Sequence, residues 1–167
     1  MFQVGDCVVS ASGGICKIVD IVKMDISGTR NEKDCFLLVP IQDENMKLYI
    51  PVDVAPQRIR KVMERKEAEE LIEEMSSVDE LVVENERFRE KDYKDAVYSG
   101  QPQRIVSVIK NIYARRQERL AQGKKTTVVD DRYFKTAVHI LHSELAYAME
   151  CKEDEVENII IKRILGD

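Results

Sequence analysis

The sequence predicts an α+β protein in which a small β-domain precedes a compact set of helices. Short runs of β-branched residues separated by glycine or polar turns, such as the one expected at Gly13-Gly14, fill residues 1–56, and hydrophobic spacing becomes helical after Pro56. The 167 residues are 44% hydrophobic and 34% charged, which is enough apolar material for compact cores under a solvated surface. We therefore expect two domains, at residues 1–56 and 57–167.

The N-terminal part is predicted to contain four or five short strands. Four of them are expected at Val4–Ser10, Ile15–Asp25, Asp34–Ile41 and Met46–Val52. In the last run, apolar residues alternate with Lys47 and Tyr49, so the two sets should lie on opposite faces. So many short strands in so few residues indicate a small SH3-like or Tudor-like barrel.

The remaining residues show five stretches of helical spacing. The helices are expected at about 58–75, 77–99, 102–122, 130–149 and 153–165. Ser77 and Glu80 have the spacing of a capping box, and Pro102 suits the first turn of a helix that Gly123 ends. Each helix has one apolar face to bury, so we expect a compact all-α bundle of about five helices.

The overall charge and the N-terminus limit the possible classes of protein. A net charge of −5 argues against a uniformly basic nucleic-acid binder. No run of about 18 apolar residues is present, which excludes a transmembrane helix and predicts no membrane partner. Residues 1–6 contain neither a basic nor a hydrophobic leader. We expect a cytoplasmic protein with reduced cysteines.

Positive charge is concentrated in one part of this acidic chain. Between Arg104 and Lys125 there are seven basic residues and one acidic residue, Glu118. Such a cluster can bind phosphate groups. Cations also favour a helix C-terminus through its dipole, so composition alone leaves phosphate binding and a plain solvated face equally open.

The sequence offers no convincing active site. His139 and His142 lie three residues apart, but the HExxH spacing of zinc enzymes is absent and no cysteine cluster adds ligands. Gly123-Lys-Lys-Thr126 lacks the first glycine and the Ser or Thr directly after the lysine that a phosphate loop requires. We therefore predict no catalysis, no metal site and no cofactor.

Several segments, taken in order along the chain, resemble the CarD/CdnL family of bacterial transcription regulators. They are Phe2–Val9 (FQVGDCVV), Leu48–Val52 (LYIPV), Tyr98–Val106 (YSGQPQRIV), Ile112–Leu120 (IYARRQERL) and Ser143–Ala146 (SELA). The resemblance covers nearly the whole chain. It implies a non-enzymatic, nucleoid-associated monomer whose first domain docks on the RNA polymerase β subunit. The second domain is implied to contact promoter DNA near the upstream edge of the bubble and to modulate open-complex stability.

The resemblance also implies which residues make these contacts. The polymerase-binding residues are Lys23, Met24, Lys47, Tyr49 and Pro51. Relatives often have arginine at positions corresponding to Met24 and Tyr49, so this interface should be more apolar. The alternative is that these side chains only cover the barrel.

The DNA-binding residues implied by the resemblance and by the basic cluster are Arg87, Phe88, Arg89, Lys91, Arg115, Arg116, Arg119, Lys124 and Lys125. Glu86 stands where the family places a tryptophan that wedges into the minor groove, and an anionic side chain cannot do this beside phosphates. Phe88 is either a substitute wedge or a core residue. The alternative function is a polymerase-docked protein–protein adaptor whose helical domain does not bind DNA.

Overall fold

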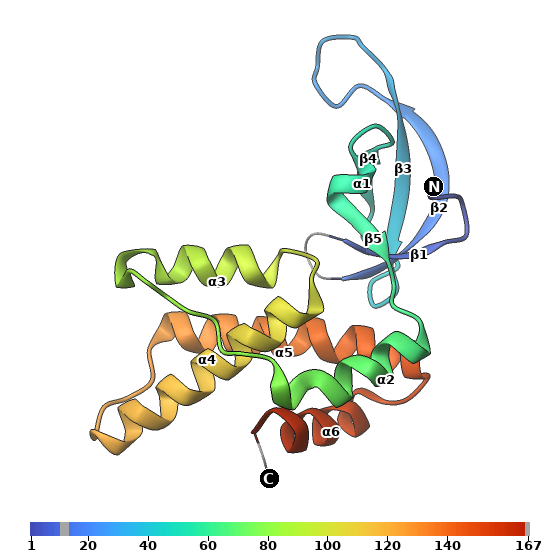
Figure 1. The fold of residues 1–167 in the computed structure, drawn as a ribbon. Coiled ribbons are helices and arrows are strands. Elements are labelled where there is room, and N and C mark those ends of the chain that lie inside the picture. The colour runs from blue at the N-terminus through green and yellow to red at the C-terminus, as the bar shows by residue number, and fades with distance from the viewer. Residues whose placement is uncertain (11–13, 166–167) are drawn as a thin grey trace. The chain divides into compact units, whose positions relative to one another are not determined.

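The computed structural model describes residues 1–10 and 14–165, with side chains up to residue 163 (Figure 1). The expected turn at Gly13-Gly14 therefore lies partly outside the described residues. The chain divides into two compact units, Met1–Val62 and Met63–Asp167. The first contains the strands and the second contains the long helices, which confirms the predicted α+β class.

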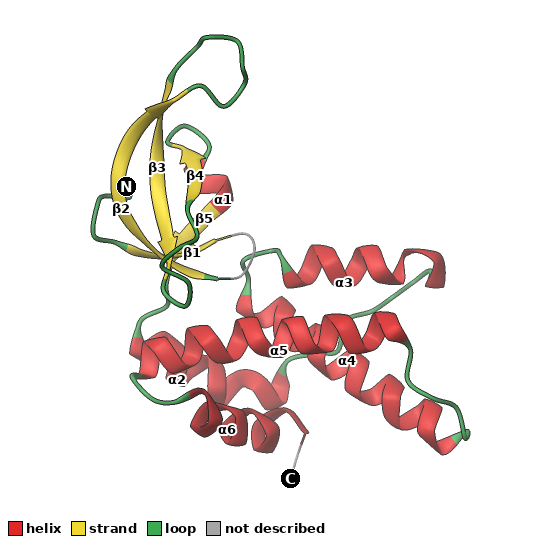
Figure 2. Cartoon of the chain, turned by 180° about the vertical axis from the view of Figure 1, so that it is seen from behind, coloured by secondary structure: helices red, strands yellow, loops and turns green. Residues whose placement is uncertain are grey.

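The first unit is an antiparallel sheet of five strands within the described residues (Figure 2). The strands are β1 (Cys7–Ser10), β2 (Ile15–Met24), β3 (Lys33–Pro40), β4 (Leu48–Pro51) and β5 (Ile59–Lys61). Their order is β4-β3-β2-β1-β5, so β4 and β5 are the edges and the sheet is not closed. The predicted barrel is therefore a loose one.

One face of this sheet carries the core of the unit. Alternate residues of the central strands, among them Ile18, Phe36 and Leu38, are buried. The short helix α1 (Ala55–Arg58) adds Ala55, and the Phe2 ring packs edge-on against Phe36 at 6.4 Å between centroids. The predicted alternation holds in β4, where Leu48 and Ile50 pack against this core.

The helix expected over residues 58–75 is wrong in its first half. Residues 59–61 form strand β5, because Val8, Val9 and Ser10 of β1 pair with it. The helix α2 (Arg65–Glu74) begins later, with Glu64 as its N-cap. The Glu64 carboxylate accepts from the backbone at Glu67, and the Glu67 carboxylate accepts from the Glu64 N–H at 2.7 Å.

The second unit contains four further α-helices in the described residues. They are α3 (Arg89–Val97), α4 (Pro102–Ala121), α5 (Val128–Met149) and α6 (Glu153–Leu165). Their apolar faces meet in one core that includes Tyr93, Ile109, Leu141 and Val156. The start of α4 at Pro102 and the extent of α6 agree with the sequence prediction. Gly123, with φ +72°, follows the end of α4, also as predicted.

The capping box predicted at Ser77 does not form. Residues 75–77 make a single 3₁₀ turn, and the chain then runs without helix to residue 85. Helix α4 binds this segment: Leu81 N–H donates to the Ser107 carbonyl (3.0 Å), and the Lys110 ammonium donates to the Val78 carbonyl (2.6 Å). Because α4 satisfies these backbone groups, the segment gains nothing from forming its own helix.

Candidate functional site

The expected polymerase contacts fall on two faces of the sheet. Residues directly opposite one another on neighbouring strands share a face, and alternate residues of a strand return to it. Tyr49 lies opposite Leu37, whereas Pro51 and Val22 both lie opposite Cys35. Met24, two residues after Val22, is therefore on the same face as Tyr49 and Pro51, opposite to the core face. We call this the outer β-face.

The two lysines predicted for the same interface are placed differently. Lys23 lies opposite Asp34 in the register of β2 and β3. Its side chain is therefore on the core side of the sheet, away from Met24. Lys47 is exposed just before β4 begins. The structure thus places Met24, Tyr49 and Pro51 on one face of the sheet and Lys23 on the other.

The outer β-face has the composition of a binding surface. Cys35 at its centre is buried, but the surrounding apolar side chains stay partly accessible: Val22, Leu37 and Met24 are half-buried, and Tyr49 is 39% exposed. Within the first unit, α1 packs on the other face through Ala55. Strand β4 is also an edge of the sheet, which leaves backbone groups on its outer side for a partner. Pro51 offers none of them, because it has no N–H and its carbonyl accepts from Val54 N–H at 3.1 Å.

In the helical unit, two of the predicted DNA contacts, Arg89 and Arg115, are part of a closed polar ring instead. Arg89 binds Glu86 through two hydrogen bonds, at 2.8 and 2.6 Å, and donates to the Tyr93 hydroxyl at 2.7 Å. The Tyr93 hydroxyl donates to Asp130 Oδ1 at 2.9 Å. Arg115 closes the ring, with Nε 3.2 Å from Asp130 Oδ2 and Nη1 3.3 Å from Glu86.

The ring is built around groups removed from water. Asp130 is 0% exposed, and its N–H is capped by the Thr127 hydroxyl at 3.1 Å. Burial, reinforced by the charge of Asp130, raises the pKa of Tyr93 to about 12. The hydrogen bond from Arg89 lowers the pKa of Glu86 to about 2. At neutral pH the ring therefore holds Glu86 ionised and Tyr93 neutral, and it joins the Glu86–Phe88 turn to α3, α4 and α5.

Two more of the predicted cations form ion pairs. Arg116 lies 2.6 Å from Asp131, and its guanidinium stacks over the Phe134 ring at 4.2 Å. Lys91 pairs with Asp95 at 2.8 Å. Arg89 and Arg115 are thus poorly placed to contact DNA, and Arg116 and Lys91 would first have to leave a partner.

The remaining cations are accessible. Arg87, Lys124 and Lys125 are exposed, and their side chains form no hydrogen bond or ion pair with any described residue. Arg119 lies one turn after Arg115 on α4, and its Nε donates to the Lys125 carbonyl at 2.9 Å. Arg115 contacts Glu86, the residue before Arg87. The accessible cations therefore lie around the C-terminal half of α4.

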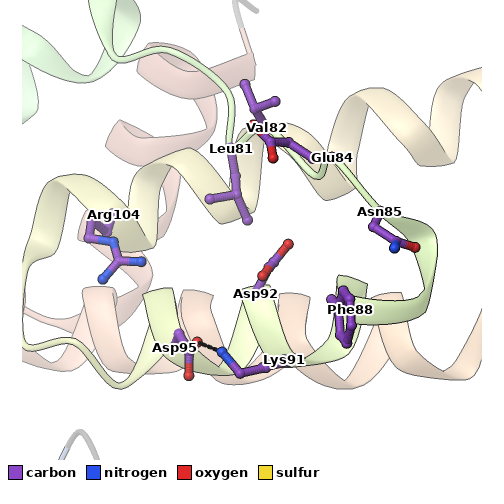
Figure 3. Close-up of a pocket in the computed structure, with 9 residues that line it drawn as sticks. All are labelled: Leu81, Val82, Glu84, Asn85, Phe88, Lys91, Asp92, Asp95 and Arg104. Atoms are coloured by element: carbon purple, nitrogen blue, oxygen red, sulfur yellow. Dashed lines mark hydrogen bonds and ion pairs between the residues drawn. The ribbon is translucent and has the colours of Figure 1, made fainter.

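Phe88 is not a core residue, so that alternative is wrong. Its side chain is 54% exposed and lines a surface groove between the 81–85 segment and α3 (Figure 3). Glu86, at the expected tryptophan position, has a 68% exposed side chain that is bound by both arginines of the ring.

Sequence reasoning missed Tyr93, Asn111 and Asp130. Asn111 joins the ring by accepting from Arg89 at 3.1 Å and donates to the Leu81 carbonyl at 2.9 Å. An aspartate in the first turn of a helix is ordinary, because it favours the helix dipole. Only the chain's fold reveals that Asp130 is buried opposite an arginine.

Other candidate chemistry is weak in the described part of the chain. His142 is buried in the helical unit, and burial lowers its pKa. Among the described residues, no three His, Cys, Asp or Glu side chains gather as a metal site would require. In the same residues, no helix is long and apolar enough to cross a membrane.

Comparison with known families agrees with both units. Residues 2–63 match the family model described as CarD-like/TRCF RID domain, and residues 70–161 match the model described as CarD, C-terminal domain. No curated protein matches the chain. CarD-like families are non-enzymatic regulators of transcription that interact with RNA polymerase. With both of its units matched in order, the chain belongs to the CarD/CdnL family.

Proposed function

We propose that the outer β-face docks on the RNA polymerase β subunit while the helical unit contacts promoter DNA near the upstream edge of the bubble. The family match to an RNA polymerase-interacting domain over residues 2–63 carries this proposal. The exposed Tyr49, the half-buried Met24 and the edge strand β4 supply the chemistry. Apolar contact area and unpaired strand groups are what a docked protein surface needs.

The regulatory effect follows from linkage. A protein that binds the open promoter complex better than the closed complex shifts the balance toward open. Docking on polymerase also raises the local concentration of the helical unit at the DNA, so its intrinsic DNA affinity can be weak. This accounts for DNA contact by a chain of net charge −5.

Within the helical unit, the proposed backbone contacts are the accessible cations Arg87, Arg119, Lys124 and Lys125. Arg89 and Arg115 instead hold the Glu86–Phe88 turn in place. Phosphate contacts fix orientation and carry little sequence information, which suits a regulator positioned by polymerase.

The first test measures binding of the purified protein to RNA polymerase. Met24→Glu with Tyr49→Glu places two charges on the outer β-face and should abolish binding, while circular dichroism confirms folding. Ile21→Glu is the matched control, because Ile21 is an exposed apolar residue of the same strand that lies opposite Phe36 on the core side. Equal binding by the double variant and the control would refute docking through this face.

A second candidate function is an adaptor whose helical unit binds no DNA. The observation that favours it is that four of the eight predicted cations, Arg89, Lys91, Arg115 and Arg116, already form ion pairs. Salt separates the two functions. DNA binding on polymerase should weaken steeply with added salt, and Lys124→Ala with Lys125→Ala should lower the salt slope by about one per lost contact. Absence of any polymerase-bound DNA contact would leave the adaptor.

A further inference from the structure

The 81–85 groove is the open groove between the Leu81–Asn85 segment and helix α3, and the proposed DNA and β-subunit contacts leave it unused. Its volume is about 720 Å³, which is within the range of sites that hold an organic ligand or a short peptide. Figure 3 shows Leu81 and Asp92 facing one another across it, with Arg104 reaching in from α4.

The lining of the groove includes two exposed apolar side chains. Val82 is 77% exposed and Phe88 is 54% exposed, and both line the same groove. The two lie on different sides of the groove, Val82 on the 81–85 segment and Phe88 beside α3 (Figure 3). An exposed apolar side chain at a concave site favours a partner that can cover it, because covering removes its surface from water.

The charges around the groove are uneven. Lys91 and Asp95 neutralise each other at 2.8 Å. Of the other charged residues that line the groove, the carboxylates Glu84 and Asp92 and the cation Arg104 form no ion pair with any described residue. The groove thus has one more carboxylate than it has cations, which disfavours nucleic-acid phosphates and favours a cationic side chain.

The Glu86–Phe88 turn is also held in a fixed position. The Asn85 side chain caps it by accepting from Arg87 N–H at 3.0 Å, and the polar ring fixes Glu86. A preorganised surface loses less conformational entropy when a partner binds, so Phe88 can act as an anchor residue for a partner.

From these observations we propose that the 81–85 groove is a docking site for a polypeptide segment of another protein. The segment presents an apolar side chain to Phe88 and places a lysine or arginine beside Asp92 and Glu84. This gives the helical unit a protein partner in addition to the contacts proposed above.

The test selects peptides from a phage-displayed random linear library on the full-length protein and measures their affinity by fluorescence anisotropy. The selected peptides should share an apolar residue close to a lysine or arginine. Asp92→Lys and Phe88→Ala should each weaken binding roughly tenfold or more, as expected for anchor positions. Glu73→Lys, the same charge change on the exposed face of α2, should change affinity by less than about twofold.

Two results would overturn the proposal. One is a selection that yields no binding peptide, or only peptides whose affinity ignores both groove variants. The other comes from a labelled single-stranded oligonucleotide: binding that Phe88→Ala weakens and Asp92→Lys strengthens would assign the groove to nucleic acid. Both groove variants lie in the second unit, so polymerase binding through the outer β-face serves as an independent control.

Discussion

Replacing Arg115 by methionine tests whether the polar ring stabilises the helical unit. Asp130 is fully buried, and Arg115 Nε lies 3.2 Å from its Oδ2. At that separation, with an effective dielectric of about 20, the attraction is about 5 kcal/mol. Removing one partner of a buried pair typically costs about 3–5 kcal/mol, because the other charge is left uncompensated. We expect a loss of this size in the free energy of unfolding.

Arg116→Met is the matched control on the next residue of α4. Its partner Asp131 is half exposed, and exposed ion pairs contribute about 1 kcal/mol or less. The stacking of Arg116 on Phe134 adds about 0.5–1 kcal/mol. The expected loss is therefore about 1–2 kcal/mol, well below that for Arg115→Met.

Urea unfolding followed by circular dichroism at the helix signal measures both losses. The double variant Arg115→Met with Asp130→Asn should recover much of the loss, because the amide still accepts from Tyr93 without leaving a buried charge. Losses that are equal for the two arginine variants, or simply additive in the double variant, would show that the Asp130 pair is not the cause.

Three further predictions concern pH. The pKa of Glu86 is about 2 instead of 4.5, so its ion pairs stabilise the fold fully above pH 4.5 and this stabilisation is lost between about pH 4.5 and 2. The difference in the free energy of urea unfolding between native protein and Glu86→Gln should vanish over that interval. The pKa of Tyr93 is about 12 instead of 10, so its neutral form stabilises the fold below pH 10 and this stabilisation is lost as the pH rises toward 12. Between pH 10 and 12, Tyr93→Phe should lose less free energy of unfolding than the native protein in the same assay. Burial lowers the pKa of His142, so its ring resonance in NMR should titrate below pH 6.5. The His142→Gln variant assigns this resonance, and a pKa above 6.5 would contradict the buried position of the ring.

Local sequence signals predicted the long helices well. Pro102 and Gly123 bracket α4, and the apolar stripe of α5 extends to its end at Met149. These signals act within a few residues, so they can be read without knowledge of the fold. The strands β2 and β3 were predicted for the same reason, since their β-branched and aromatic residues determine both pairing and burial.

The wrong predictions lie where distant partners decide the structure. Residues 59–61 become a strand because β1, about 50 residues earlier, offers an unpaired edge. The Val78–Leu81 stretch stays extended because Lys110 and Asn111 bind its carbonyl groups. Neither partner is visible in the local pattern, and tertiary contacts override a capping motif whose worth is only about 1 kcal/mol.

The candidate site shows the same limit. A sequence shows the arginines at positions 89 and 115, but not that Glu86 and Asp130 bind them. The exposure of Phe88 likewise depends on the non-helical course of the chain before it. Counting basic residues therefore overestimates the cations available to phosphate groups, and only the folded chain distinguishes the accessible ones.

The small number of accessible cations has a consequence for how the proposed regulator works. Few phosphate contacts give weak binding, and non-specific DNA affinities at physiological salt correspond to dissociation constants of about 10⁻⁴ to 10⁻⁶ M. A short tether to polymerase gives the helical unit an effective concentration of about 1 mM at the DNA. Even a site with a dissociation constant of about 10⁻⁴ M would then be roughly nine-tenths occupied on polymerase and nearly empty elsewhere. Under the proposed function, pairing Arg89, Arg115 and Arg116 internally would thus help to restrict DNA contact to promoters where polymerase is already bound.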